Sequence, residues 1–207
     1  MSTRAASWLA WSLVTLSVVL LAGGIAFAQM ARSTAPGRPY FGPLEAAFIL
    51  ATVLTFSVVG AIIASRQPHN AIGWIFCGIG LVVSLNSLAG SYTVYRLAGG
   101  SVPGNLLAET AAWFASWSWT LWLYVPTTFL LLLFPDGRLP SPRWRPVAWC
   151  AALGVISFVA YSALEPGPLE DFLRITNPYG VDSPILGAFA IVGVILAAAS
   201  MLAPPSR

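Results

Sequence analysis

Charge is scarce in this chain. Only 8% of its 207 residues are charged, whereas a typical soluble domain has about 25%. Residues 8–30 contain no charged side chain, and 57% of all residues are hydrophobic. A soluble domain of this size has no interior large enough for so much apolar surface. The composition therefore excludes that class and predicts a protein embedded in a membrane.

Lysine is absent, histidine occurs once and cysteine twice. The ten arginines are spread along the chain and form no phosphate-binding cluster, so no nucleic-acid partner is expected. The histidine, His69, has no cysteine or carboxylate near it in the sequence, which argues against a metal site. Cys77 and Cys150 provide no disulfide framework. We interpret both as small packing residues, with a redox or metal role as the alternative, and expect no cofactor.

Six apolar segments separated by short loops fill the chain. A helix needs roughly 20 apolar residues to cross the hydrocarbon core of a bilayer. The segments are residues 8–29, 44–64, 71–94, 108–134, 146–164 and 184–203. The sequence therefore predicts an all-α polytopic transmembrane bundle of about six spans, in which residues 1–207 form a single transmembrane domain.

The distribution of arginines predicts the orientation of these spans, because cytoplasmic loops carry an excess of positive charge. With the N-terminus inside, the inner side holds Arg4, Arg66, Arg138, Arg143, Arg145 and Arg207. The other four arginines lie outside, so we predict both termini to be cytoplasmic (N-in, C-in). Residues 26–28, Ala-Phe-Ala, have the form of a signal-peptidase site. Cleavage there is the alternative, and it leaves five spans.

Small residues recur along one face of the third segment. Gly73, Cys77, Gly80 and Ser84 follow one another at intervals of three or four residues, which places them on one side of a helix. Small side chains let helices approach closely in lipid, so we predict a helix-packing seam, with a pore lining as the alternative. We expect the amide of Asn86, beside this seam, to hydrogen-bond a neighbouring helix.

The fourth segment is rich in aromatic side chains. Trp and Tyr favour the membrane–water boundary, so an interfacial belt or core packing accounts for many of them. Trp113 and Trp117, however, share one helix face close to Glu109. An aromatic wall with a carboxylate can hold a cation or an amphiphile, so these three residues are the candidate ligand-binding site. Pro126 is expected to kink the same helix.

Acidic residues within the segments occur only near helix starts, at Glu45 and Glu109. A carboxylate in the first turn of a helix is stabilised by the free N–H groups and the helix dipole, and ligand or proton sensing is the alternative. A pump or ion-coupled carrier needs ionisable groups at mid-membrane, and the segments contain none. They also contain no Ser-His, His-Glu or paired-Asp arrangement, so we predict no catalytic residue and no enzymatic activity in this chain.

The connection after the fourth segment reads LLLLFPDGRLPSPRWRPVAW, residues 130–149. Pro135 ends the helix, and Asp136 with Gly137 favours a tight turn. Arg138 holds the connection at the anionic inner surface. We therefore predict a structural turn made by these four residues.

This string resembles the N-terminal membrane region of sensor histidine kinases common in actinobacteria and related phyla. In that family a span ending in LFPDGRLPS is followed by RWRPVAW. Residues 64–81, ASRQPHNAIGWIFCGIGL, resemble a second family block, in which Ala71 replaces the usual proline. Residues 177–180, Asn-Pro-Tyr-Gly, resemble a third element. The resemblance extends over most of the chain, and FPDGRLP is its specific part.

The resemblance implies a sensor or signalling module of a bacterial two-component system, located as a multi-pass protein in the plasma membrane. It implies the lipid bilayer and a cytoplasmic signalling domain or protein as partners, and a homodimer by analogy. These 207 residues contain no phosphoacceptor histidine box and no glycine-rich ATP-binding segment, so they do not carry kinase catalysis. A small transporter or channel is the alternative function.

Overall fold

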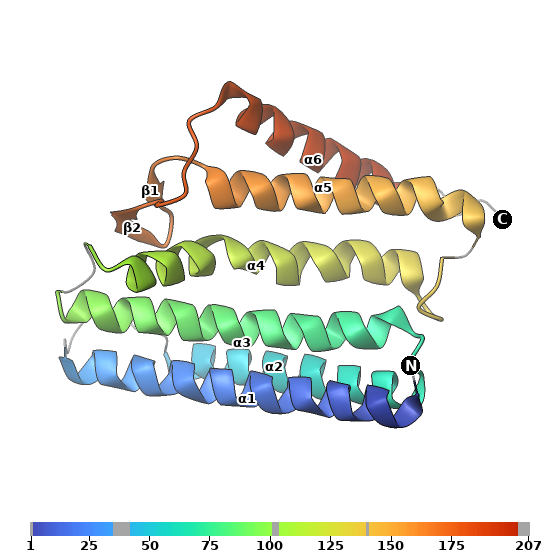
Figure 1. The fold of residues 1–207 in the computed structure, drawn as a ribbon, viewed down its shortest axis with the longest axis horizontal. Coiled ribbons are helices and arrows are strands. Elements are labelled where there is room, and N and C mark those ends of the chain that lie inside the picture. Colours follow the sequence, from blue (N-terminus) through green and yellow to red (C-terminus); the bar gives the residue numbers. More distant parts are fainter. Residues whose placement is uncertain (1, 35–41, 101–103, 140, 203–207) are drawn as a thin grey trace.

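The computed structural model describes residues 2–34, 42–100, 104–139 and 141–202. Six long helices run side by side along the molecule (Figure 1). They are α1 (Thr3–Thr34), α2 (Pro43–Arg66), α3 (Ala71–Ala98), α4 (Leu106–Leu133), α5 (Arg145–Leu164) and α6 (Pro184–Leu202). Each helix coincides with one predicted apolar segment, so the helical bundle is confirmed.

Two short features add to the six helices. The 3-10 helix η1 (Pro142–Trp144) precedes α5, and the strands β1 (Pro168–Leu169) and β2 (Phe172–Thr176) form an antiparallel sheet between α5 and α6. The sequence analysis did not predict this hairpin, because strand β1 has only two residues and its pairing depends on contacts with the helices. We name the end of the bundle that carries the sheet the hairpin end (Figure 1, left).

The opposite end of the bundle carries the connections α2–α3 and α4–α5, and we name it the arginine end. Four arginines lie in or beside these connections, namely Arg66, Arg138, Arg143 and Arg145. Because successive helices reverse direction, α1 begins and α6 ends at this same end (Figure 1).

Four helical stretches of the described chain are long and apolar enough to cross a membrane. They are Thr3–Thr34, Leu44–Arg66, Ala71–Ala98 and Pro142–Leu164. Helix α4 is not among them, because its many Trp, Ser and Thr side chains lower its hydropathy. In α6 only the shorter apolar stretch Pro184–Gly193 is found. The membrane character is thus supported by four helices.

The interior of the bundle is made of small side chains, and large apolar side chains face outward. Ser84, Thr93 and Ser118 are 0% exposed, whereas Trp8 is 78% and Leu131 is 72% exposed. In lipid, close packing of small residues drives helix association, and outward apolar side chains meet a matching solvent. This distribution is the one expected of helices surrounded by lipid.

Helix α3 lies at the centre of the bundle and packs against α1, α2 and α4. Helix α5 packs between α4 and α6. In Figure 1, α1 to α4 form one group, and α5 with α6 lies along its edge.

The predicted seam of α3 faces α2. A Cβ built at Gly73 would lie 2.7 Å from a backbone nitrogen of α2, and one at Gly80 would overlap a serine hydroxyl of that helix. A Cβ at Gly60 of α2 would lie 2.6 Å from the backbone nitrogen of Cys77, which is itself 1% exposed. Ser84, one turn further, donates to the carbonyl of Gly80 at 2.8 Å. The two backbones therefore touch along this line.

Asn86 joins α3 to α4, as predicted. Its Nδ2 donates to the carbonyl of Ala115 and to the hydroxyl of Ser118, both at 2.8 Å. Such side-chain bonds between helices in lipid contribute about 0.6 kcal/mol on average.

Polar side chains satisfy the backbone at the helix starts, as predicted. An oxygen of Glu45 accepts from the backbone N–H of Gly42 at 2.7 Å, and one of Glu109 accepts from that of Gly104 at 3.0 Å. Asn70 caps α3. Both carboxylates therefore make the backbone bonds expected at a helix start, which leaves a further ligand role untested.

Candidate ligand-binding cavity

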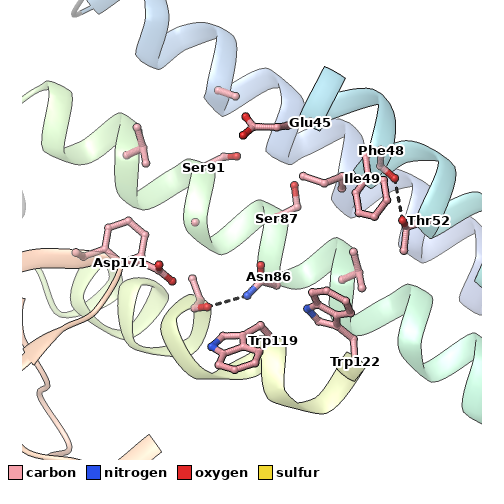
Figure 2. Close-up of a pocket in the computed structure, with 16 residues that line it drawn as sticks. Glu45, Phe48, Ile49, Thr52, Asn86, Ser87, Ser91, Trp119, Trp122 and Asp171 are labelled. Carbon is pink, nitrogen blue, oxygen red and sulfur yellow. Dashed lines mark hydrogen bonds between the residues drawn. The ribbon is translucent and has the colours of Figure 1, made fainter. Parts of the chain in front are cut away.

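A cavity of about 580 Å³ lies in the hairpin half of the bundle. Helices α1, α2, α3 and α4 contribute its walls, the turn between β1 and β2 contributes Asp171, and β2 contributes Phe172. Figure 2 shows its lining side chains. Cavities that hold small molecules typically measure about 300–1,000 Å³, so this one has the size of a small-ligand site.

The cavity exists because small residues from three helices face one another. Ala28 of α1, Gly90 of α3 and Ala115 of α4 all line it. A Cβ built at Gly90 would meet nothing nearer than the Cβ of Ala115, at 3.8 Å. A side chain could therefore be added at Gly90 without a clash at its Cβ, unlike along the seam.

Aromatic rings form much of the wall. Trp119 and Trp122 come from α4, Phe48 from α2 and Phe172 from β2. Figure 2 shows the two indole rings beside Asn86 on the α4 side of the cavity. Among the described residues neither indole N–H makes a hydrogen bond, so both remain available as donors. Helix α4 continues through Pro126, which has no N–H to give to the carbonyl of Trp122.

Helix α3 contributes polar groups to the cavity through Asn86, Ser87 and Ser91. The amide nitrogen of Asn86 is committed to α4, but within the described chain its oxygen accepts no hydrogen bond. Ser91 is only 3% exposed, and its hydroxyl has no hydrogen-bond partner in the part of the chain that the structure describes.

Two carboxylates face the cavity from different elements. Glu45 of α2 and Asp171 of the hairpin turn lie on opposite sides of it in Figure 2. Partial burial raises the pKa of Asp171, and the neighbouring charge of Glu170 raises it further. None of the described residues that line the cavity is basic, so neither carboxylate has a cationic side chain there.

The hairpin is held over the cavity by the segment that follows it. The Nδ2 of Asn177 donates to the carbonyls of Ala163, at 3.0 Å, and Glu165, at 2.8 Å. The hydroxyl of Tyr179 bonds to that of Thr110 in α4 at 2.9 Å. The Asn-Pro-Tyr-Gly element thus ties the hairpin to α4 and α5.

The aromatic pair singled out from the sequence has a different environment. The Nε1 of Trp113 donates to the carbonyl of Ala163 at 2.6 Å, and its ring lies 4.7 Å from that of Tyr179 and 5.4 Å from that of Trp117. Trp117 has a buried indole N–H without a partner among the described residues. These rings pack α4 against α5, while Glu109 closes the first turn of α4. None of the three lines the cavity, and their ligand role stays a prediction.

The predicted turn lies at the arginine end, where it meets the start of α3. Gly137 has φ +70°, and a Cβ there would overlap the side chain of Asn70. Pro135, Asp136 and Arg138 border a surface groove together with residues 66–70. The two blocks that carry the family resemblance are therefore in contact.

Sequence reasoning missed Trp119, Trp122 and Asp171 as lining residues. The spacing of three between the two tryptophans was a usable signal, because it puts them on one helix face. Asp171 gave none, because its position depends on the hairpin. No group of three His, Cys, Asp or Glu that could hold a metal ion occurs among the residues the structure describes.

Comparison of the chain with models of protein families, with curated proteins and with solved structures finds no match.

Proposed function

We propose that the chain is the membrane-embedded sensor module of a bacterial signalling protein, with six spans and both termini in the cytoplasm. The observation that carries the proposal is the cavity at the hairpin end, which has the size and the polar groups of a ligand site. With the arginine end inside, the cavity lies in the outer half of the bundle. A molecule from the cell exterior or from the outer leaflet could reach it.

Helix α4 links the cavity to the inner face. Trp119 and Trp122 line the cavity, and the same helix ends at the turn where Gly137 meets Asn70. A ligand that displaces α4 would move this turn relative to the start of α3. A cytoplasmic signalling domain or protein would respond to that movement.

A small transporter or channel is the competing function, and the arginine half of the bundle argues against it. There the backbones of α2 and α3 touch at Gly60 and Gly73, and the cavity lining does not extend to these residues. A transport path needs an opening at both ends. Flux of an organic cation or a neutral solute through proteoliposomes, lost on Gly80→Leu, would favour the transporter instead.

Distance measurements between spin labels test the sensor proposal without a known ligand. Labels are placed at positions 69 and 138, after both native cysteines have been changed to alanine. Gly90→Leu is the test variant, because its added side chain fills the cavity in place of a ligand. Gly78→Leu is the control, because it adds the same side chain where the structure shows open space. The proposal expects a changed distance distribution for Gly90→Leu only. Identical distributions in both variants would overturn it.

A reporter fused after Arg207 tests the orientation. Cytoplasmic reporter activity is expected, because six of the ten arginines then lie inside. Periplasmic activity would contradict both the C-in topology and the sensor proposal.

A further inference from the structure

Among the described residues that line the cavity, none supplies a counter-charge to its two carboxylates. One carboxylate oxygen of Glu45 accepts a hydrogen bond from the backbone N–H of Gly42. In Figure 2 the carboxylate is drawn on the side of Ser91. Asp171 approaches from the opposite side, and no basic residue is among the described lining residues. Both carboxylates remain accessible to solvent, while partial desolvation and the neighbouring charge of Glu170 raise the pKa of Asp171. A bound cation would supply a counter-charge to the two carboxylates.

The aromatic wall favours the same charge. The faces of aromatic rings attract cations, and tryptophan does so most strongly. Trp119 and Trp122 lie together on the α4 side, and Phe172 adjoins Asp171 on the hairpin. An anion would meet ring faces and carboxylates of the same sign, so the wall excludes it.

Hydrogen-bond acceptors line the α3 side. Ser91 is 3% exposed, and neither its hydroxyl nor the amide oxygen of Asn86 is bonded to any other described residue. Figure 2 shows both side chains at the cavity. These oxygens, with the carboxylates, match a group that carries several N–H donors, such as an ammonium.

The remaining wall is apolar. Ile49, Val83 and Val94 line it together with alanine and glycine. A bare metal ion would leave this surface and most of the 580 Å³ unused. An alkyl chain of modest length suits the space.

We infer that the cavity binds an amphipathic alkylammonium ion, with the ammonium between Glu45 and Asp171 and the chain against the apolar wall. The inference rests on the proposed function only in taking the cavity as the ligand site. The three N–H donors of the ammonium are available to these carboxylates, to the Ser91 hydroxyl and to the Asn86 amide oxygen, and Trp119 and Trp122 line the same cavity.

Calorimetric titration of the full chain in maltoside micelles tests the inference, with octylammonium as the probe and 1-octanol as the neutral molecule of equal chain length. Octylammonium is expected to bind saturably and octanol at least about tenfold more weakly, because a charge-assisted hydrogen bond contributes about 1.5–3 kcal/mol. The double change Glu45→Gln with Asp171→Asn should weaken octylammonium binding at least about tenfold. Gly90→Leu should abolish it.

Two control variants separate cavity binding from uptake by the micelle. Asp182→Asn removes an exposed carboxylate that is not part of the lining, and Gly78→Leu enlarges α3 away from it. Both should bind as the unchanged chain does. Circular dichroism establishes that each variant is folded. Equal binding of octanol, or undiminished octylammonium binding in Gly90→Leu or in the double variant, would overturn the inference.

The inference and the sensor proposal fail separately. If octylammonium binds but the spin-label distances between positions 69 and 138 do not change, the sensor proposal is overturned. The inference that the cavity binds an alkylammonium ion is then kept. If octylammonium does not bind but the spin-label distances change in Gly90→Leu, the inference of an alkylammonium ligand is overturned. The sensor proposal is then kept.

Discussion

Two glycines on the same helix, Gly80 and Gly90, have opposite roles. At Gly80 a Cβ would overlap a serine hydroxyl of α2, whereas at Gly90 it would meet only the Cβ of Ala115 at 3.8 Å. The first glycine allows two backbones to touch, and the second leaves room for a cavity. The difference arises from the neighbouring helices and not from the glycine itself.

The same contrast recurs in the surroundings of α3. At the arginine end, close backbone contact makes the structure rigid, because interiors packed without voids transmit displacements. In the hairpin half, α3 lies close to α1 at Gly24 but borders the cavity at Gly90. Close packing and open space are therefore both present along this one helix.

The largest effect is expected where the backbones touch. Gly80→Leu should lower the free energy of unfolding by about 3 kcal/mol, because an added side chain must push α2 and α3 apart. Gly90→Leu should lower it by less than about 1 kcal/mol, since the cavity accepts the side chain. Thermal unfolding in detergent measures both, with Gly78→Leu as the control. Equal losses at Gly80 and Gly90 would remove the distinction between the two glycines.

The turn at the arginine end should be the next most sensitive place. Gly137→Val places a β-branched residue at φ +70°, against the side chain of Asn70, and should cost about 2 kcal/mol or more. Gly100→Val imposes a similar φ, +72°, in open space, and should cost less. Folded yield and thermal unfolding report the difference. Normal stability of Gly137→Val would show that the turn does not brace α3; Pro135→Leu offers a second test of the same turn.

The two aromatic faces of α4 should differ by a smaller amount. Trp113→Phe removes the 2.6 Å bond to the carbonyl of Ala163 and should lower the free energy of unfolding by about 1 kcal/mol. Trp119→Phe removes no hydrogen bond to a described residue and should leave stability nearly unchanged. Octylammonium titration should give the reverse order, with weaker binding only in Trp119→Phe. Weaker binding in Trp113→Phe or Glu109→Gln would instead favour the site predicted from the sequence.

The smallest effect concerns the pH dependence of stability. The pKa of Asp171 is raised by burial and by Glu170, so the folded state holds this proton more tightly than the unfolded chain. The free energy of unfolding therefore falls as pH rises from about 3.9 through the raised pKa. Asp171→Asn should remove this pH-dependent decrease in the free energy of unfolding. The variant should therefore be more stable than the unchanged chain only at pH values above the raised pKa. Parallel unfolding curves from pH 3 to 8, measured on both proteins, would contradict it.

Much of the fold was predictable, because a bilayer leaves few choices. Each apolar segment became a helix, Asn70 caps α3, and Asn86 bonds to α4 as expected. Local spacing also revealed the face of α3 that packs, since Gly73 and Gly80 recur on one side. Predictions of this kind need only the period of a helix and the sizes of its side chains.

The position of the cavity was not predictable from the sequence. The sequence suggested that aromatic rings and a carboxylate on α4 could hold a cation, and it pointed to Trp113 and Glu109. In the structure Trp113 donates a hydrogen bond to the carbonyl of Ala163 and packs against the ring of Tyr179. The cavity lies beside Trp119 instead. Which face of α4 meets a neighbour and which meets empty space depends on α5 and the hairpin, and no local pattern encodes that choice.

By itself, the sequence determined that the chain forms apolar helices, where each is centred, and which face of α3 carries small residues, because these properties depend on hydropathy and on residues within one or two turns. Only the tertiary structure decided that Asp171 reaches the mouth of a cavity in α1 to α4, that Gly137 contacts Asn70, and that Gly90 borders a void while Gly80 borders a backbone. These outcomes join residues far apart in the chain, and their energies depend on how well all six helices fill the shared space.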